Sequence, residues 1–335
     1  MPTSPFAPST SSPGTGNIRI AKLPPEKQIL KSFEYQYPLK LIAPDPHISA
    51  GPSHHTVTLV FLLTYGGGLV GGDKICLNVS LEENTRLVLV TQGSTKIFKS
   101  PARSVVSAQT LHVTIAGGAS LCYLPDPTQP FSESIYEQKQ TFLVHPCGTS
   151  SLCVLDWVSE GRRARGESWT LWSWKGRNEI RESPQENAER SRLLLRDAVM
   201  LSNDSGEAVQ PGASIVERTN GMGVFGTLIL YGPTFQALAA FFLNEFKSQP
   251  RIGARNWTDG EGEKRISKEA SPKEKRLQQE KADGLLWTAA YTRGFVIVKF
   301  GAREIGGARQ WIGDMIRCQG SIERDFGYQA LIGLR

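Results

Sequence analysis

A polar stretch at residues 91–100 carries side chains that could guide a cation or a partner protein. It follows an apolar, strand-like run and concentrates hydroxyls, an amide and two lysines, among them Thr95 and Lys96. A polar strand end of this kind is either a solvated turn or a surface for recognition or transit. The residues alone favour neither reading over the other.

Two further stretches suit docking. Residues 124–131 hold three prolines around Asp126 and end at Phe131, so the loop is rigid at little entropic cost. Residues 155–167 place three arginines and three carboxylates around a glycine turn, and arginine forks favour bidentate pairing with carboxylates, within the chain or across an interface. The chemical groups of this third stretch are Asp156, Glu160, Arg162, Arg163, Arg165 and Glu167.

Motifs for nucleotide and acyl chemistry fail on their context. Residues 66–71 and 221–226 both fit G-x-G-x-x-G, but each runs into a strand-like segment where a dinucleotide fold needs a helix. A phosphate loop at 67–73 would put Asp73 where a lysine is required, and that carboxylate would repel phosphate. There is no G-x-S-x-G elbow. These patterns predict tight backbone turns.

Two other function classes keep a candidate set. Asp126, Glu133 and Asp156 could supply the acid and base of a β-helical carbohydrate enzyme, although a sequence gives no distance between carboxyl groups. His145, Cys147 and Cys153 lie close together in the chain and could hold a soft or borderline cation. Buried thiols and a histidine at a strand end explain the second set equally simply.

Charge and cysteine content limit the partners and the compartment. The formal charge is +6 with a pI near 9.0, but the 38 basic residues are interspersed with 32 acidic ones, so no nucleic-acid partner is expected. Five cysteines in 335 residues do not form a disulfide framework and fit a reducing cytoplasm. The N-terminus lacks the pattern of a signal peptide, and the longest apolar run, 57–63, is too short for a membrane span.

The elements that must position these groups are mostly strands. A tail is expected to be disordered at 1–28, and a single β-rich domain at 29–335, with two accessory helices at 234–247 and around Trp311. A charged insertion at 251–283, expected to be disordered, lies inside that domain and does not divide it. The predicted strands are 56–64, 74–81, 86–91, 105–115, 138–144, 151–158, 169–174, 227–231 and 295–300.

Five blocks, in order, resemble the signature of the UreD (UreH) family of urease accessory proteins. They are GGGLVGGD at 66–73, TQGSTKIF at 91–98, LPDPTQPF at 124–131, LDW with GR and RGESW between 155 and 169, and LRDA at 195–198. One block would be weak, but five in sequence are specific. The tail and the charged insertion depart from the family pattern and indicate a eukaryotic, fungal-like member.

The resemblance implies a mainly β, β-helical fold with about two accessory helices and no catalysis by this chain. It further implies an assembly chaperone that binds apo-urease, bridges it to UreF-type and UreG-type (GTPase) proteins, and passes nickel through an internal tunnel. Transient Ni²⁺ would then be handled at Asp73, Thr95, Asp156 and Glu167, without a tightly bound cofactor. Lys96, Asp126, Phe131, Arg162 and Arg165 would serve partner contacts or the motif structure.

Overall fold

The computed structural model describes residues 12–51, 54–184, 191–203, 213–249 and 272–335, and within them the strands form two sheets. The seven-stranded sheet has the order β16 (Leu193–Ser202), β15 (Ser173–Glu182), β13 (Ile135–Val144), β10 (Ser107–Ile115), β7 (Lys74–Leu81), β1 (Thr15–Leu23) and β2 (Lys27–Tyr35). The 12-stranded sheet has the main order β18 (Leu286–Thr292), β19 (Phe295–Ala302), β17 (Val224–Tyr231), β14 (Ser151–Ser159), β11 (Ser120–Tyr123), β8 (Arg86–Val90), β5 (Thr56–Thr64) and β3 (Leu39–Ile42). Four short strands, β4 (His47–Ile48), β6 (Gly68–Leu69), β9 (Thr95–Ile97) and β12 (Thr128–Pro130), join it beside this path.

The central strands wind as a flattened β-helix. From β7 to β15 the longer strands alternate between the two sheets, and within each sheet their neighbours are parallel. Each coil therefore stacks on the one before it. Side-chain contacts show the same step: Ser100 bonds to Ile135 and Ser150 to Ile115, each 35 residues away. The mainly β, β-helical fold expected from the sequence is confirmed.

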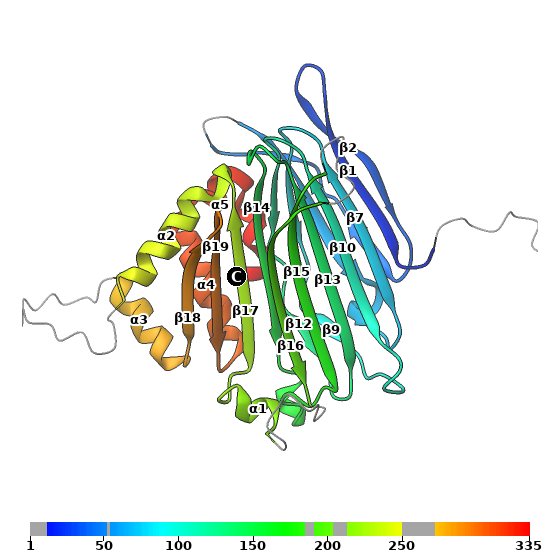
Figure 1. Cartoon of the computed structure of the whole chain (residues 1–335), viewed down its shortest axis with the longest axis vertical. Helices are drawn as coiled ribbons and strands as arrows, with labels where there is room; N and C mark the ends of the chain where they lie inside the picture. Colours follow the sequence, from blue (N-terminus) through cyan, green and yellow to red (C-terminus); the bar gives the residue numbers. More distant parts are fainter. Residues whose placement is uncertain (1–11, 52–53, 185–190, 204–212, 250–271) are drawn as a thin grey trace, which may run out of the picture.

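The sheets and helices form three layers (Figure 1). Apolar residues such as Leu77, Phe142 and Val154 fill the space between the sheets. A second core lies between the 12-stranded sheet and helices that contribute Phe242 and Trp311. Strand β14 is buried at nearly every position because it has a layer on both faces, which is why its sequence is mostly apolar apart from Asp156 and the serines at its ends.

The helices α2 and α4 match the two accessory helices that the sequence predicts. The described residues also contain three others, two of them short. The helices are α1 (Ile215–Arg218), α2 (Gln236–Lys247), α3 (Pro272–Ala282), α4 (Ile305–Gln319) and α5 (Ser321–Phe326). None of the described helices has both the length and the apolar character needed to cross a lipid bilayer.

The expected disordered tail at 1–28 is too long. Residues 1–11 lie outside the described part of the chain, but β1 starts at Thr15, pairs with β2 and β7, and buries Ile18 and Ile20 completely. Two apolar side chains at alternate positions are enough for a strand when the neighbouring sheet supplies the rest of the core.

The expected insertion at 251–283 also needs correction. Residues 250–271 lie outside the described residues, whereas 272–282 form α3. This helix packs on the domain: Arg276 forms an ion pair with Glu245 of α2, and Glu280 accepts a hydrogen bond from Trp311. The strand before the insertion, β17, and the strand after it, β18, both pair with β19 in the same sheet. A further difference is that 169–172 are not strand, because β15 begins only at Ser173.

Candidate functional site

A half-buried carboxylate lies between the two sheets. Asp156 projects from β14, and its Oδ1 accepts a hydrogen bond of 2.7 Å from Nε2 of Gln138 on β13. Its Oδ2 accepts one of 2.6 Å from Nδ2 of Asn178 on β15. Because β14 belongs to one sheet and β13 and β15 to the other, the two amides hold the carboxylate across the gap between the sheets.

The negative charge of Asp156 is only partly compensated by its surroundings. Burial raises the pKa of Asp156, and the hydrogen bonds from Asn178 and Gln138 offset only part of that effect. Burial, together with the nearby Asp156, also raises the pKa of the Tyr123 hydroxyl. A carboxylate that is short of compensating charge attracts a cation or a proton.

Asp156 lines two cavities. On one side lies a narrow space of about 10 Å³ with a largely polar lining. On the other side lies a cavity of about 190 Å³ that Asp156 shares with Thr227, Lys299 and apolar side chains. The narrow space is lined by Thr91, Thr95, Gln109, Tyr123, Pro125, Asp126, Thr128, Gln138, Gln140, Asp156 and Trp157. We call these two neighbouring spaces, which share Asp156 and Trp157 in their linings, the polar path.

Two oxygens near the polar path have no hydrogen-bond partner. Within the described residues, Oε1 of Gln140 and Oδ1 of Asn178 are buried and unsatisfied. Buried polar atoms normally find a partner, so these carbonyl oxygens are available to a water or a cation. The polar path thus offers uncharged oxygen atoms, which could bind a cation, near the carboxylate of Asp156.

This donor set suits brief contact with a divalent cation. Oxygen ligands bind nickel-like ions less firmly than imidazole or thiolate, and one carboxylate contributes a single charge. The described residues contain no group of three or more His, Cys, Asp or Glu side chains that could chelate a metal.

Two of the expected site residues lie along the narrow space beside Asp156. Thr95 of β9 lines it, whereas Lys96, the next residue of the strand, is exposed on the other side. Asp126 also lines it and is almost fully buried. The Asp126 Oδ2 accepts hydrogen bonds from the Thr91 hydroxyl and the Gly93 amide.

The expected residues Asp73 and Glu167 do not line either space. Oδ2 of Asp73 accepts a hydrogen bond of 2.9 Å from the Val70 amide, which closes the turn before β7. Glu167 is paired with Arg162, whose Nε lies 2.8 Å from Oε2, and the hydrogen bonds from Arg162 hold the pKa of Glu167 below its usual range. Their expected role in nickel transit stays a prediction.

The expected partner-contact residues near Glu167 are Phe131, Arg162 and Arg165. The Arg162 guanidinium lies over the Phe131 ring at 4.1 Å from its centroid, and Phe131 also meets Phe98 edge to face. Arg165 is exposed in the turn that follows.

The residues that the sequence reading missed are the inward amides Gln109, Gln138, Gln140 and Asn178, and also Lys299. Their signal was present in β13, where Gln138 and Gln140 alternate on the core-facing side of a strand.

The two other function classes gain no geometric support. Asp126 and Asp156 share only the space of about 10 Å³, which has no room for a sugar ring, and Glu133 pairs with Lys99. His145 and Cys147 lie in the turn after β13, whereas Cys153 is buried in the core beneath the helices. The carboxylates do not meet in a cleft, and the three soft ligands do not form one site.

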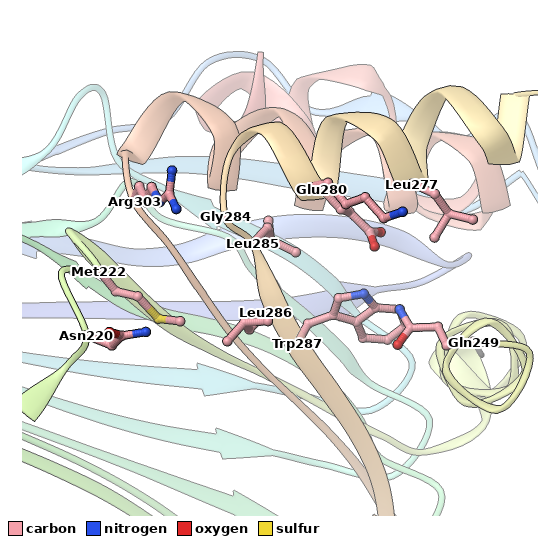
Figure 2. Close-up of a pocket in the computed structure, with 11 residues that line it drawn as sticks. Asn220, Met222, Gln249, Leu277, Glu280, Gly284, Leu285, Leu286, Trp287 and Arg303 are labelled. Carbon is pink, nitrogen blue, oxygen red and sulfur yellow. The ribbon is translucent and has the colours of Figure 1, made fainter. Parts of the chain in front are cut away.

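A larger cavity lies beside α3 (Figure 2). It measures about 490 Å³, and Figure 2 shows Leu277 and Glu280 of α3 above Trp287 of β18. Its buried carboxylate, Glu280, already accepts a hydrogen bond from Trp311. The cavity therefore offers contact surface and no catalytic pair of groups.

Comparison with known proteins decides the family. The profile of the family described as "UreD urease accessory protein" matches residues 13–328. This chain belongs to the UreD family. A "Urease accessory protein D" of Oryza sativa subsp. indica is 32% identical over 248 residues, 74% of each chain. The "Uncharacterized urease accessory protein ureD-like" of Schizosaccharomyces pombe is 31% identical over 278 residues, which cover 83% of this chain and 84% of that protein. A "Urease accessory protein UreD" of Sorangium cellulosum is 30% identical over 230 residues, 69% of this chain and 65% of that one.

The blocks that resemble the UreD signature meet in one corner of the fold. Strand β6 from the first block pairs with β9 from the second, and β9 pairs with β12 from the third. Strand β12 in turn pairs with β14, where Thr128 lies opposite Val158. This short ladder brings Thr95, Asp126 and Asp156 to the same polar path although they are far apart in the UreD-family sequence.

Proposed function

We propose that this UreD-family protein is a non-catalytic assembly factor that helps to load nickel into apo-urease. In this proposal it binds apo-urease and bridges it to UreF-type and UreG-type proteins. Nickel is its cargo and is not a resident cofactor. The family assignment and the names of its relatives, which are urease accessory proteins, support the proposal.

The observation that carries the proposal is the polar path through Asp156. A cation that leaves water must find replacement ligands, and the two spaces are lined by hydroxyls, amide oxygens and the carboxylates of Asp126 and Asp156. The unsatisfied oxygens of Gln140 and Asn178 are ready acceptors for a hydrated ion. Weak oxygen ligands lower the barrier to entry without trapping the ion.

The charges at the wider end of the polar path fit the passage of a cation. The ammonium of Lys299 would repel nickel, but its Nζ lies 2.5 Å from Oδ1 of Asp197 on β16. This ion pair offsets the positive charge next to Asp156. At the narrow end, Asp126 is likewise balanced by Arg309, so Asp156 is the strained carboxylate of the path.

The compartment that we infer is the cytoplasm, where urease would be assembled. All five cysteines are free thiols, including Cys122 and Cys153, which face each other on neighbouring strands β11 and β14. Thiols this close survive where the surroundings are reducing.

The test is nickel loading in cells that express apo-urease, UreF-type and UreG-type proteins and either the wild-type chain or Asp156→Ala. Urease nickel content is measured by mass spectrometry, and complex formation by co-purification. We expect Asp156→Ala to reduce loading about tenfold, which corresponds to about 1.4 kcal/mol on the passage. Asp314→Ala, at an exposed carboxylate of α4, is the matched control and should load normally.

Two results would overturn the proposal. If cells that lack this protein load nickel fully, the protein is not an assembly factor for that urease. If Asp156→Ala keeps the complex and loads as well as Asp314→Ala, nickel does not use the polar path.

A further inference from the structure

The outer face of the seven-stranded sheet is left uncovered by α2, α3, α4 and α5, which lie against the other sheet (Figure 1). Every second residue of its strands faces outward, as their alternating burial shows. Five cationic side chains gather on neighbouring strands of this face, and we call them the arginine face. They are Lys139 of β13, Lys175, Arg177 and Arg181 of β15, and Arg196 of β16.

Three of these cations converge on one carboxylate. Glu179 lies within 3.6 Å of Arg177, 2.9 Å of Arg181 and 3.0 Å of Arg196, and its side chain is only 5% exposed. Burial raises the pKa of Glu179, but the arginines lower it more, so the carboxylate stays ionised below its usual range. Three positive charges around one negative charge leave an excess of two, held on guanidinium groups whose positions are fixed.

A hollow lies beside the arginines on this face of the sheet. It measures about 480 Å³ and runs across four strands. The hollow is open because Ala108 and Ala198 stand where larger side chains would fill it, and Met200, which is 67% exposed, borders it. The rim is formed by Lys139, Lys175 and Arg177 together with Glu137.

We propose that the arginine face docks an acidic, extended segment of a partner protein. Arginine forks bind carboxylates in bidentate geometry, and those around Glu179 have donors to spare. An extended segment would lie in the hollow, with acidic side chains on Arg177 and Arg196 and an apolar one on Met200. Exposed cations that are held near the buried Glu179 would give such a surface both charge complementarity and orientation.

The same surface fits nucleic acid or a lipid bilayer less well. The exposed Glu137 pairs with Lys175 and reduces the positive charge that a continuous row of phosphates would meet. The large rings of these strands, Tyr136 and Trp174, point into the core, so the described part of this face offers no platform on which bases could stack.

The experiment measures binding of a short fluorescein-labelled peptide of alternating glutamate and threonine by fluorescence anisotropy at low salt. We expect Arg177→Glu with Arg196→Glu to weaken binding about tenfold or more. The control, Lys247→Glu with Arg293→Glu, reverses the same number of charges at exposed sites of α2 and the β18–β19 turn, and should change affinity by less than about twofold.

A second variant guards against misfolding. Lys139→Glu with Lys175→Glu leaves the arginines around Glu179 intact, and it should also weaken the peptide several-fold while thermal unfolding stays unchanged. Hydrogen exchange on the wild-type protein should show peptide-dependent protection in β13, β15 and β16.

The proposal fails if all variant pairs, the control included, weaken binding equally, because a net charge of +6 would then explain the attraction. It also fails if a DNA duplex or phosphatidylserine vesicles bind more tightly than the peptide with the same dependence on Arg177 and Arg196. The assay contains neither urease nor nickel, so its failure and that of the loading experiment are separate results.

Discussion

Oδ1 of Asp126 lies 2.8 Å from an Nη of Arg309, which joins the proline-rich loop to α4 across 183 residues of sequence. The carboxylate is 2% exposed and the guanidinium 27% exposed, so solvent screens the pair weakly. The loop that borders the polar path is thus held in place by the helical layer behind the 12-stranded sheet.

Removing the cation of this pair should destabilise the fold. Arg309→Met leaves the Asp126 carboxylate buried without a counter-charge, and we expect a loss of about 3 kcal/mol in the free energy of unfolding. Urea denaturation measures it. The double variant Asp126→Asn with Arg309→Met should recover most of the loss, because no buried charge remains. A double variant as unstable as the single one would show that the pair contributes through packing alone.

The stability difference between wild type and Asp156→Asn should depend on pH. Burial raises the pKa of Asp156 in the folded protein above its ordinary value of 3.8. Between pH 3.8 and that folded-state pKa, the folded protein therefore holds a proton that the unfolded chain has released. The wild type therefore loses stability as pH rises from 3.8 through the folded pKa, and Asp156→Asn does not. Urea denaturation from about pH 4 to neutrality should show the variant gaining on the wild type. A difference that does not change with pH would mean that folding does not raise the pKa of Asp156.

Variants at Glu167 can separate a structural role from nickel transit. The pair with Arg162 places the arginine over Phe131, so either partner is needed to keep the corner packed. We expect Glu167→Ala and Arg162→Met to lower the unfolding temperature and the nickel loading of urease to similar extents. If only Glu167→Ala impairs loading while both variants are equally stable, the Glu167 carboxylate itself handles nickel.

Gly176 should not tolerate a methyl group. A Cβ there would lie 2.4 Å from Cη2 of Trp174, a buried ring between the sheets. Gly176→Ala should cost about 1 to 3 kcal/mol of unfolding free energy, since the ring must leave its position. Gly306→Ala is the control, because nothing lies within 4 Å of its Cβ position and alanine suits the helix α4. Equal stability of both variants would show that the ring moves freely.

Much of the strand pattern could be predicted from local sequence. Strands β5 and β7 begin and end where their apolar alternation does, and the proline before α2 marks the start of that helix. The strand β1 was missed because half of its core is supplied by β7, and no local pattern reports a partner so distant. Helix α3 was missed because its surface is almost entirely charged, so it lacks an apolar face that would indicate burial.

The site was predicted in part. The family blocks pointed to Thr95 and Asp156, and both line the polar path. They also pointed to Glu167, which does not line the polar path. Glu167 pairs with Arg162, and the turn between these two residues sets the position of the Glu167 carboxylate. The amides of Gln138 and Asn178 could be found only when the register of β13, β14 and β15 was known.

The step of 35 residues between hydrogen-bonded partners has a kinetic consequence. Thr91 and Asp126 meet across that interval, as do Ile115 and Ser150. Chains dominated by such distant pairings fold slowly, typically over milliseconds to seconds. The wider space of the polar path is lined by Thr227 of β17 and Lys299 of β19, so the path is complete only after β19 has joined the sheet. A nascent chain therefore forms the polar path among the last steps of its folding.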